Sequence, residues 1–211
     1  MSLRVLKPGL LTTVQDRGRH GLQYLGVVPC GAMDPVALEL ANALAGNQGG
    51  EAALEITVLG PELHFESDAL IALCGAEFDA RIAGGALPLN RPVLVTKQSR
   101  LIVGRAHRGS RAYLAVAGGI GTAPVLGSRS TCLPAKFGGF DGRTLRAGDV
   151  LPLVQNASDL AFDRFKVLSS RKELQKGVQS VAWAAPALTV PEREPGIESP
   201  DVGLPRRETH H

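Results

Sequence analysis

Two early segments, residues 15–21 and 26–34, hold the side chains best suited to chemistry. The first places Asp16, Arg19 and His20 among glycines, and glycine lets a backbone approach a polar ligand because it carries no side chain. An arginine can donate to a carbonyl or carboxylate oxygen, and a histidine can exchange a proton near neutral pH. These segments therefore predict a loop that binds a polar ligand. The alternative is a long glycine-rich connection with solvated charges.

A second candidate follows a predicted strand at residues 113–117, which runs into the glycines of residues 118–121. Because arginine offers a fixed fork of donors, hydroxyl groups gathered around one arginine can cradle an anion. The alternative is an ordinary turn in which the serine side chains bond to their own backbone. The residues of this hydroxyl-rich stretch are Ser128, Arg129, Ser130 and Thr131.

The composition excludes several classes of protein. The net charge is +3, aromatic residues make up 4%, and no basic run is present, which argues against nucleic-acid binding. The three cysteines are widely spaced and form no Cys-x-x-Cys pair, so neither a metal site nor a disulfide framework is expected. With no signal peptide and no apolar run of about 18 residues, we expect a soluble, cytoplasmic protein without membrane contact.

Common cofactor motifs are also absent from the sequence. It contains no Walker A loop, no Gly-x-Ser-x-Gly elbow, no His-Glu-x-x-His pair and no Met-Lys-Met biotin-attachment site. Any ATP that the protein binds must therefore occupy a surface without such a motif. The chain is not expected to carry covalent biotin.

Short apolar segments punctuated by Gly, Pro, Asn or Asp predict a mainly β fold. Regular short strands separated by turn signals favour a barrel or a sandwich over βαβ units. The alternation is weak in several of them, so both faces of the sheet are expected to be covered. The predicted strands are residues 3–6, 54–58, 63–65, 70–74, 78–82, 93–95, 101–103, 113–117 and 150–153.

One helix is expected, at about residues 35–45. Asp34 can cap it with its carboxylate, Pro35 suits the first helical position, and Gly46 follows its predicted C-terminal end. This capping role gives Asp34 a structural purpose. Apolar residues at three- and four-residue spacing predict one buried face.

Glu55 lies among apolar neighbours in the predicted strand 54–58. An unpaired buried carboxylate is costly, so Glu55 is expected to pair with Arg17 or Arg19 if it points inward. Such a pair would tie the first loop to the barrel and would make Glu55 structural.

The chain changes character near residue 155. Beyond Arg171 it contains five prolines, many charges and little periodicity. We therefore expect a barrel domain at residues 1–160 and a divergent or truncated, partly disordered extension at residues 161–211.

Taken together, several uncommon motifs in order resemble the allophanate hydrolase subunit 2 family, also described as biotin-dependent carboxyltransferase-like proteins. The family includes the C subunit of 5-oxoprolinase and the antagonist of a sporulation-kinase inhibitor (KipI). The resemblance covers about residues 3–153. It is carried by residues 5–10, 12–16, 18–19, 29–34, 42–47, 53–57, 60–61, 117–120 and 124–131.

The resemblance implies a cyclophilin-like β-barrel and work within a complex. The expected partners are a sister barrel subunit of the KipI type and a LamB/YcsF-type subunit. The implied function is ATP-dependent opening of the cyclic amide 5-oxoproline to glutamate. Two alternatives remain open, namely carboxyl transfer from carboxybiotin to urea and a regulatory module that binds a kinase-inhibitor protein.

Family members continue for roughly another hundred residues, which form a second barrel-like half. The end of this sequence does not follow the pattern of that half. We therefore expect this chain alone to be inactive. An exposed half-molecule also favours a homodimer.

The resemblance further implies which residues act on a small amide substrate. Fixed donors aimed at the carbonyl oxygen would stabilise its developing negative charge. The expected donors are Arg19, the backbone of Gly31 and Ala32, and the turn Ser128–Arg129–Ser130–Thr131. Asp16 would orient Arg19, and His20 would exchange a proton.

Overall fold

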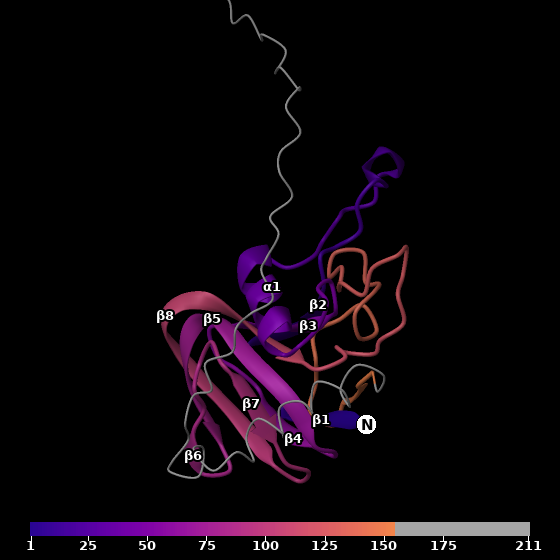
Figure 1. Ribbon diagram of the computed structural model, residues 1–211. Coiled ribbons are helices and arrows are strands. Elements are labelled where there is room, and N and C mark those ends of the chain that lie inside the picture. Colours follow the sequence, from indigo (N-terminus) through magenta and orange to yellow (C-terminus); the bar gives the residue numbers. More distant parts are fainter. Residues whose placement is uncertain (155–211) are drawn as a thin grey trace, which may run out of the picture.

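Two long antiparallel strands, β5 (Ala69–Ile82) and β8 (Arg100–Val116), form the centre of the fold in the computed structural model (Figure 1). The structure describes residues 1–154, so the expected extension at 161–211 and the last residues of the predicted 1–160 domain lie outside it. The other elements are β1 (Ser2–Lys7), β2 (Leu11–Gln15), the 3₁₀ helix η1 (Gln23–Leu25), α1 (Pro35–Leu44), β3 (Ala53–Thr57), β4 (Glu62–Phe65), β6 (Gly85–Ala86), β7 (Pro92–Val95) and β9 (Val150–Pro152).

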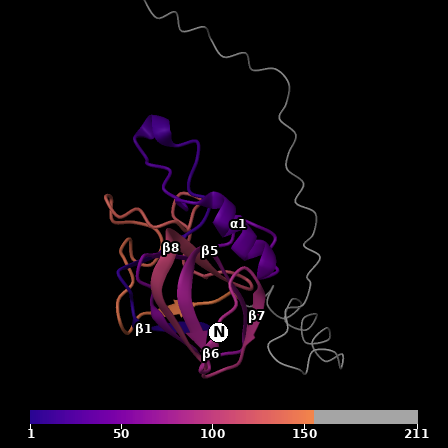
Figure 2. The ribbon, with the colours of Figure 1, turned by 90° about the vertical axis from the view of Figure 1, so that its left-hand side faces the viewer.

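All nine described strands belong to one antiparallel sheet. Its main order is β2-β3-β8-β4-β1-β9, and β5 pairs with β6, β7 and β8. β8 pairs with β5 along one edge, and with β4 and then β3 along the other. Strands of this length twist strongly, and three register shifts in β5 between Gly75 and Ala80 add local bends. The sheet consequently curls into the half-barrel seen in Figure 2.

Apolar side chains cover both faces of the curled sheet, as the weak alternation predicts. The larger core lies inside the curl and includes Leu54, Leu73 and Leu114. On the opposite face, Leu38 of α1 packs in a second core with Tyr113 of β8. Successive residues of β8 therefore alternate between the two cores.

Within residues 1–154, the mainly β prediction and the single α-helix are confirmed. Helix α1 begins at Pro35, and the Asp34 carboxylate accepts a hydrogen bond from the Ala37 backbone N–H at 3.0 Å. Asp34 therefore performs the expected capping role. Cys74 is buried in the second core, and this burial raises its pKa to about 12.

The predicted strand lengths are wrong in two places. Segments 70–74 and 78–82 are parts of β5, and segments 101–103 and 113–117 are parts of β8. Gly75 has φ of +107° and signals a turn in the sequence, but in the structure it lies within a bulged strand.

Strand β2 is not among the predicted strands. Its threonines and glutamine lack the apolar alternation of a half-buried strand, yet four of its five residues are buried.

Replacing Leu114 with Ala should lower the free energy of unfolding by about 2–5 kcal/mol, because a cavity would remain in a closely packed core. Leu114 is fully buried and lies opposite both Leu54 of β3 and Leu73 of β5. The matched control is Leu10→Ala, whose side chain is 65% exposed. Urea denaturation measures both, and equal effects would contradict this account of the core.

Candidate functional site

The Asp16 carboxylate, directly after β2, occupies the turn that the sequence singles out as an anion cradle. It accepts hydrogen bonds from the Ser128 hydroxyl at 2.6 Å, the Ser130 hydroxyl, the Arg129 backbone N–H at 2.5 Å and the Gly18 backbone N–H at 2.8 Å. Its side chain is buried. The turn therefore does hold an anion, and that anion belongs to the chain itself.

These hydrogen bonds control the charge of Asp16. Burial by itself raises the pKa of the carboxyl group, but the bonds from Ser128, Ser130 and the two backbone N–H groups outweigh it, and the pKa lies below its ordinary value. Asp16 is therefore ionised at neutral pH. It stabilises the loops as a fixed negative charge.

Arg19 lies beside this cluster with only 2% of its surface exposed. Its Nη2 donates to the Ser130 carbonyl oxygen at 2.5 Å and its Nε to the Val125 carbonyl oxygen at 3.3 Å. The guanidinium carbon lies 4.7 Å from the centroid of the Phe137 ring. Asp16 and Arg19 do not pair directly, and Ser130 joins them by donating to one and accepting from the other. Arg19 is thus sealed behind the loops.

The remaining expected site residues divide into two groups. The backbone N–H of Ala32 donates to the Asp16 carbonyl oxygen at 3.0 Å, and Gly31, with φ of +93°, packs so closely on Arg17 that a Cβ would lie 2.9 Å from the Arg17 carbonyl oxygen. These two residues therefore belong to the Asp16 cluster. His20 is exposed, and its Nε2 lies 3.0 Å from the Arg17 carbonyl oxygen.

Two side chains of the hydroxyl-rich turn are also used within the fold. The Thr131 hydroxyl donates to the Val14 carbonyl oxygen at 2.9 Å, and Arg129 Nε donates to the Thr122 carbonyl oxygen at 2.7 Å. The turn therefore directs most of its donors inward.

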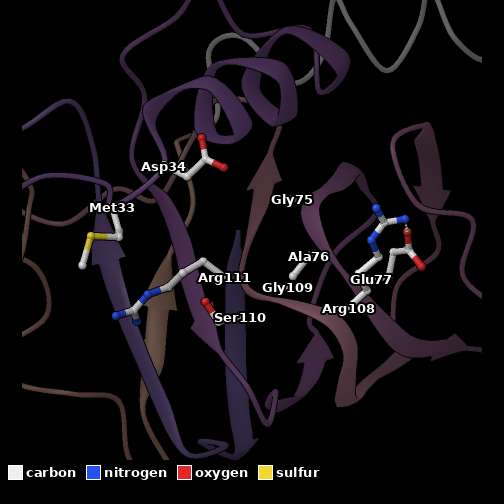
Figure 3. Close-up of a pocket in the computed structure, with 9 residues that line it drawn as sticks. All are labelled: Met33, Asp34, Gly75, Ala76, Glu77, Arg108, Gly109, Ser110 and Arg111. Atoms are coloured by element: carbon white, nitrogen blue, oxygen red, sulfur yellow. Dashed lines mark ion pairs between the residues drawn. The ribbon is translucent and has the colours of Figure 1, made fainter.

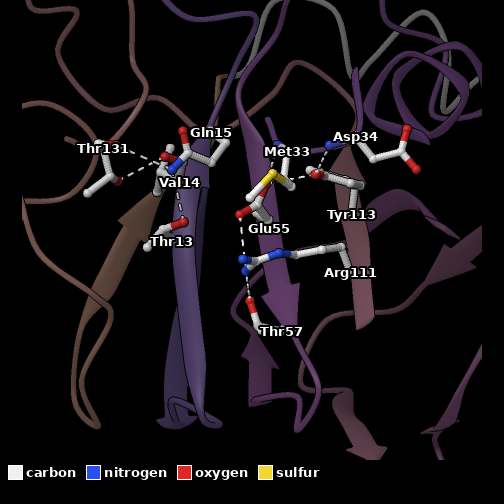
Figure 4. Close-up of polar contacts among 10 residues, drawn as sticks. All are labelled: Thr13, Val14, Gln15, Met33, Asp34, Glu55, Thr57, Arg111, Tyr113 and Thr131. Carbon is white, nitrogen blue, oxygen red and sulfur yellow. Dashed lines mark hydrogen bonds and ion pairs between the residues drawn. The ribbon is translucent and has the colours of Figure 1, made fainter. Parts of the chain in front are cut away.

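Glu55 is buried, but the expected pairing with Arg17 or Arg19 is wrong. Its Oε2 accepts from the Tyr113 hydroxyl at 2.7 Å and from the Met33 backbone N–H at 2.8 Å, while Oε1 lies 3.5 Å from Arg111 Nη1 (Figure 4). The reason is the register of β3 on β8, which places Tyr113 directly opposite Glu55 and Arg111 two residues away on the same face. Arg17 instead pairs with Glu39 at the surface.

Tyr113 joins this network to the start of α1. Its hydroxyl donates to Glu55 and accepts from the Asp34 backbone N–H at 2.7 Å. Burial, reinforced by the Glu55 carboxylate, raises the pKa of Tyr113 far above its ordinary value. The phenol is therefore neutral and holds the helix start against the sheet.

An open pocket of about 450 Å³ lies between the start of α1 and the bulged part of β5 and β8. We call it the helix-start pocket. Asp34 and Arg111 reach it from different elements, as Figure 3 shows. The Asp34 carboxylate caps α1 through Oδ1 only, and Arg111 uses Nη1 to contact Glu55 and Thr57. The lining residues are Met33, Asp34, Gly75, Ala76, Glu77, Arg108, Gly109, Ser110 and Arg111.

Sequence reasoning missed most of this pocket. It singled out Asp34 but gave no role to Arg108 or Arg111. The available signal was Glu55 on one strand and Arg111 on another, and it becomes informative only when the β3–β8 register is known.

Within residues 1–154, no group of three or more His, Cys, Asp or Glu side chains is placed to hold a metal ion. In the same part of the chain, no helix has the length and apolar character needed to cross a membrane.

Residues 25–192 match the protein family described as "Carboxyltransferase domain, subdomain A and B". The chain is 43% identical over 157 residues to the C subunit of 5-oxoprolinase from Escherichia coli, covering 74% of this chain and 51% of that protein. It is 40% identical over 155 residues to urea amidolyase of Lachancea kluyveri, covering 73% of this chain and 8% of that protein. The chain thus spans about half the length of one relative and a small part of the other.

The fold also resembles solved structures. The crystal structure of the urea amidolyase of Kluyveromyces lactis superposes with a TM-score of 0.72 at 42% sequence identity, covering 74% of this chain and 9% of that chain. The half-barrel is therefore shared with a portion of a much longer protein.

Asp16→Asn should lower the free energy of unfolding at pH 7 by roughly 2–4 kcal/mol, because one carbonyl oxygen cannot serve four donors, two of which are buried hydroxyl groups. The folded-state pKa of Asp16 is lowered, so its stabilising effect is present above the unfolded pKa of about 4 and is lost as pH falls below it. The difference in free energy of unfolding between wild type and variant should consequently become smaller as the pH falls from about 5 to about 3. Urea denaturation across this range measures it.

Asp141→Asn, at a side chain 73% exposed, is the control for this experiment. If the difference in free energy of unfolding between wild type and Asp16→Asn stays constant with pH, the Asp16 charge is not the stabilising feature.

Tyr113→Phe should lower the free energy of unfolding by about 1–3 kcal/mol. The substitution removes one donor from the buried Glu55 carboxylate and removes the acceptor of the Asp34 N–H. Tyr24→Phe removes the same hydroxyl from a residue that is 82% exposed and should change stability little. Thermal unfolding compares the two. Equal midpoints for both variants would contradict a structural role for the Tyr113 hydroxyl.

Proposed function

Because this chain belongs to the family of carboxyltransferase domains, subdomain A and B, we propose that it acts in a 5-oxoprolinase-type complex that opens a small cyclic amide at the expense of ATP. The substrate is 5-oxoproline and the product is glutamate. The proposed partners are a sister barrel subunit and a LamB/YcsF-type subunit.

One comparison carries the proposal. The chain covers half of the Escherichia coli 5-oxoprolinase protein at 43% identity, whereas it covers less than a tenth of the urea amidolyases of Lachancea kluyveri and Kluyveromyces lactis at similar identity. The corresponding 5-oxoprolinase protein of Haemophilus influenzae is 37% identical over 147 residues, which cover 47% of its length. The 5-oxoprolinase proteins are therefore the relatives of more comparable size.

The helix-start pocket has groups suited to a cyclic amide. An amide places an N–H donor beside a carbonyl acceptor. The Asp34 carboxylate can accept from that N–H through the oxygen not used for capping, and the free N–H groups of Arg111 can donate to the carbonyl oxygen. Arg108, at the same pocket, supplies a positive charge for the carboxylate of 5-oxoproline, a group that urea lacks.

Opening the lactam requires water to add to the carbonyl carbon and the ring C–N bond to break, with a proton passing to the leaving nitrogen. Negative charge develops on the carbonyl oxygen, where a preorganised donor stabilises it. Arg111 suits this role because Glu55 and Thr57 hold its guanidinium in place. Within residues 128–131, the hydroxyl groups of Ser128 and Ser130 donate to Asp16 and that of Thr131 donates to Val14, so the proposal places the substrate beside Arg111.

A second candidate function is carboxyl transfer to urea. It is favoured by the description of the matching family and by the structural likeness to urea amidolyase. Urea presents the same pairing of N–H donor and carbonyl acceptor, so the two candidates share the pocket and differ in the need for Arg108.

The test is reconstitution of the full chain with a sister barrel subunit and a LamB/YcsF-type subunit, with glutamate release from 5-oxoproline and ATP as the readout. Arg111→Ala should reduce kcat/KM by about 100-fold or more. Arg105→Ala, an exposed change on the same strand outside the pocket, should leave it near wild type. Arg108→Ala should raise KM for 5-oxoproline.

Turnover of urea with carboxybiotin but not of 5-oxoproline would replace the proposal by carboxyl transfer. Tight binding to the sister subunit without glutamate release would favour a regulatory module.

A further inference from the structure

Arg19 is a buried cation that forms no direct ion pair among the described residues, although Ser130 links it to Asp16. In residues 1–154 no carboxylate lies within ion-pair distance of it, and it contacts two carbonyl oxygens, the Phe137 ring and the Cys30 thiol. Its Nη1 is buried and has no hydrogen-bond partner in the described part of the chain. A buried charge left in this condition is costly, so the surroundings of Arg19 favour an anion nearby.

The Cys30 thiol beside Arg19 does not supply this counter-charge. Burial and the neighbouring Cys132 thiol raise the pKa of Cys30 to about 11, despite the opposing effect of the Arg19 charge. Cys30 is therefore a neutral thiol at physiological pH. Cys132 is buried and is not in a disulfide.

A second pocket, of about 520 Å³, lies against the residues that enclose Arg19. We call it the glycine-loop pocket. Val125, Phe137 and Gly138 line it, and each of them contacts the Arg19 side chain or leaves room for it. The other lining residues are Gly121, Thr122, Ala123, Lys136, Gly139, Phe140, Asp141, Gly142 and Pro152.

Glycine is required where the pocket wall covers Arg19. Gly138 has φ of +70°, and a Cβ there would lie 2.8 Å from Arg19 Nη2 and 2.3 Å from the Ser130 carbonyl oxygen. Only backbone thus separates the guanidinium from the pocket at this point. The positive charge of Arg19 therefore lies close behind this part of the pocket wall.

The same pocket offers further donors. Thr122 is 7% exposed, and its hydroxyl oxygen is buried without a partner in the described residues. The turn from Gly138 is closed by the Gly142 N–H at 2.7 Å from the Gly138 carbonyl oxygen. Lys136 adds an exposed positive charge at the rim.

Asp141 also lies at the rim, and among the described residues its carboxylate is the one acidic side chain that lines this pocket. It is largely exposed and lies 3.5 Å from Arg143, which partly balances its charge. The pocket therefore retains a positive character.

We propose that the glycine-loop pocket binds a small molecule bearing an oxyanion, either a carboxylate or a phosphate group, with Lys136 in contact, the unpartnered Thr122 hydroxyl in the pocket wall and Arg19 acting electrostatically from behind Gly138. The inference is independent of the proposed amide site, because no described residue lines both pockets. Arg19 is accordingly a positioning residue whose charge serves a ligand that it does not touch.

The experiment is titration of the full chain with inorganic phosphate, ATP and glutamate, followed by calorimetry and by protein NMR. Thr122→Val keeps the side-chain shape and Lys136→Gln removes the rim charge, and each should weaken binding about tenfold. Lys97→Gln, at an exposed lysine outside the pocket, should have no effect. Added salt should weaken binding to wild type more than to Lys136→Gln.

Binding of phosphate and ATP assigns the site to phosphoryl ligands, and binding of glutamate alone assigns it to carboxylates. Either outcome supports the proposal when the two pocket variants weaken it. Absence of binding by all three probes at millimolar concentration, or binding unchanged in both pocket variants, would overturn it. Thermal unfolding of each variant separates lost binding from lost folding.

Discussion

The ionised carboxylate of Asp16 is the interaction on which one end of the molecule depends. Four donors from two distant segments converge on it, two of them hydroxyl groups and two backbone N–H groups. These bonds join the end of β2, the beginning of the loop at residues 16–34 and the turn at residues 128–130. Because the donors are buried, loss of the charge would leave them unpaired, and the placement of Arg19 through Ser130 would be lost with them.

Glu55 has the same role at the other end of the loop. It receives Tyr113 and the Met33 N–H, and Tyr113 in turn receives the Asp34 N–H. Two buried carboxylates thus anchor the two ends of the loop at residues 16–34, which contains η1. Asp16 holds its beginning and Glu55 holds its end. Each network also supports a residue near a pocket. The Glu55 network holds Arg111 in the helix-start pocket, and the Asp16 cluster holds Arg19 behind the glycine-loop pocket. Apolar packing builds the half-barrel, whereas these polar networks position the groups able to meet a ligand.

Local signals in the sequence were sufficient for part of the fold. Asp34, Pro35 and Gly46 defined α1 because capping depends on residues close together in the chain. Strand lengths were harder to predict. Gly75 signals a turn in the sequence, but β5 continues through it as a bulge because it pairs with β8 on both sides of this residue. The residues of the Asp16 cluster were recognised as polar and grouped, but their mutual bonds were not, because Asp16 and Ser130 are far apart in the sequence.

The sequence by itself determined the family, the mainly β class, the single capped helix and the two polar segments that meet around Asp16. Only the tertiary structure decided which charges are buried and which reach a pocket. It buried Arg19, turned the hydroxyl-rich turn toward Asp16, paired Glu55 with Arg111 and brought Arg111 to the same pocket as Asp34. The reason is physical: caps and strand patterns arise from neighbours along the chain, whereas the partner of a buried charge is set by strand register and by which segments the folded sheet brings together.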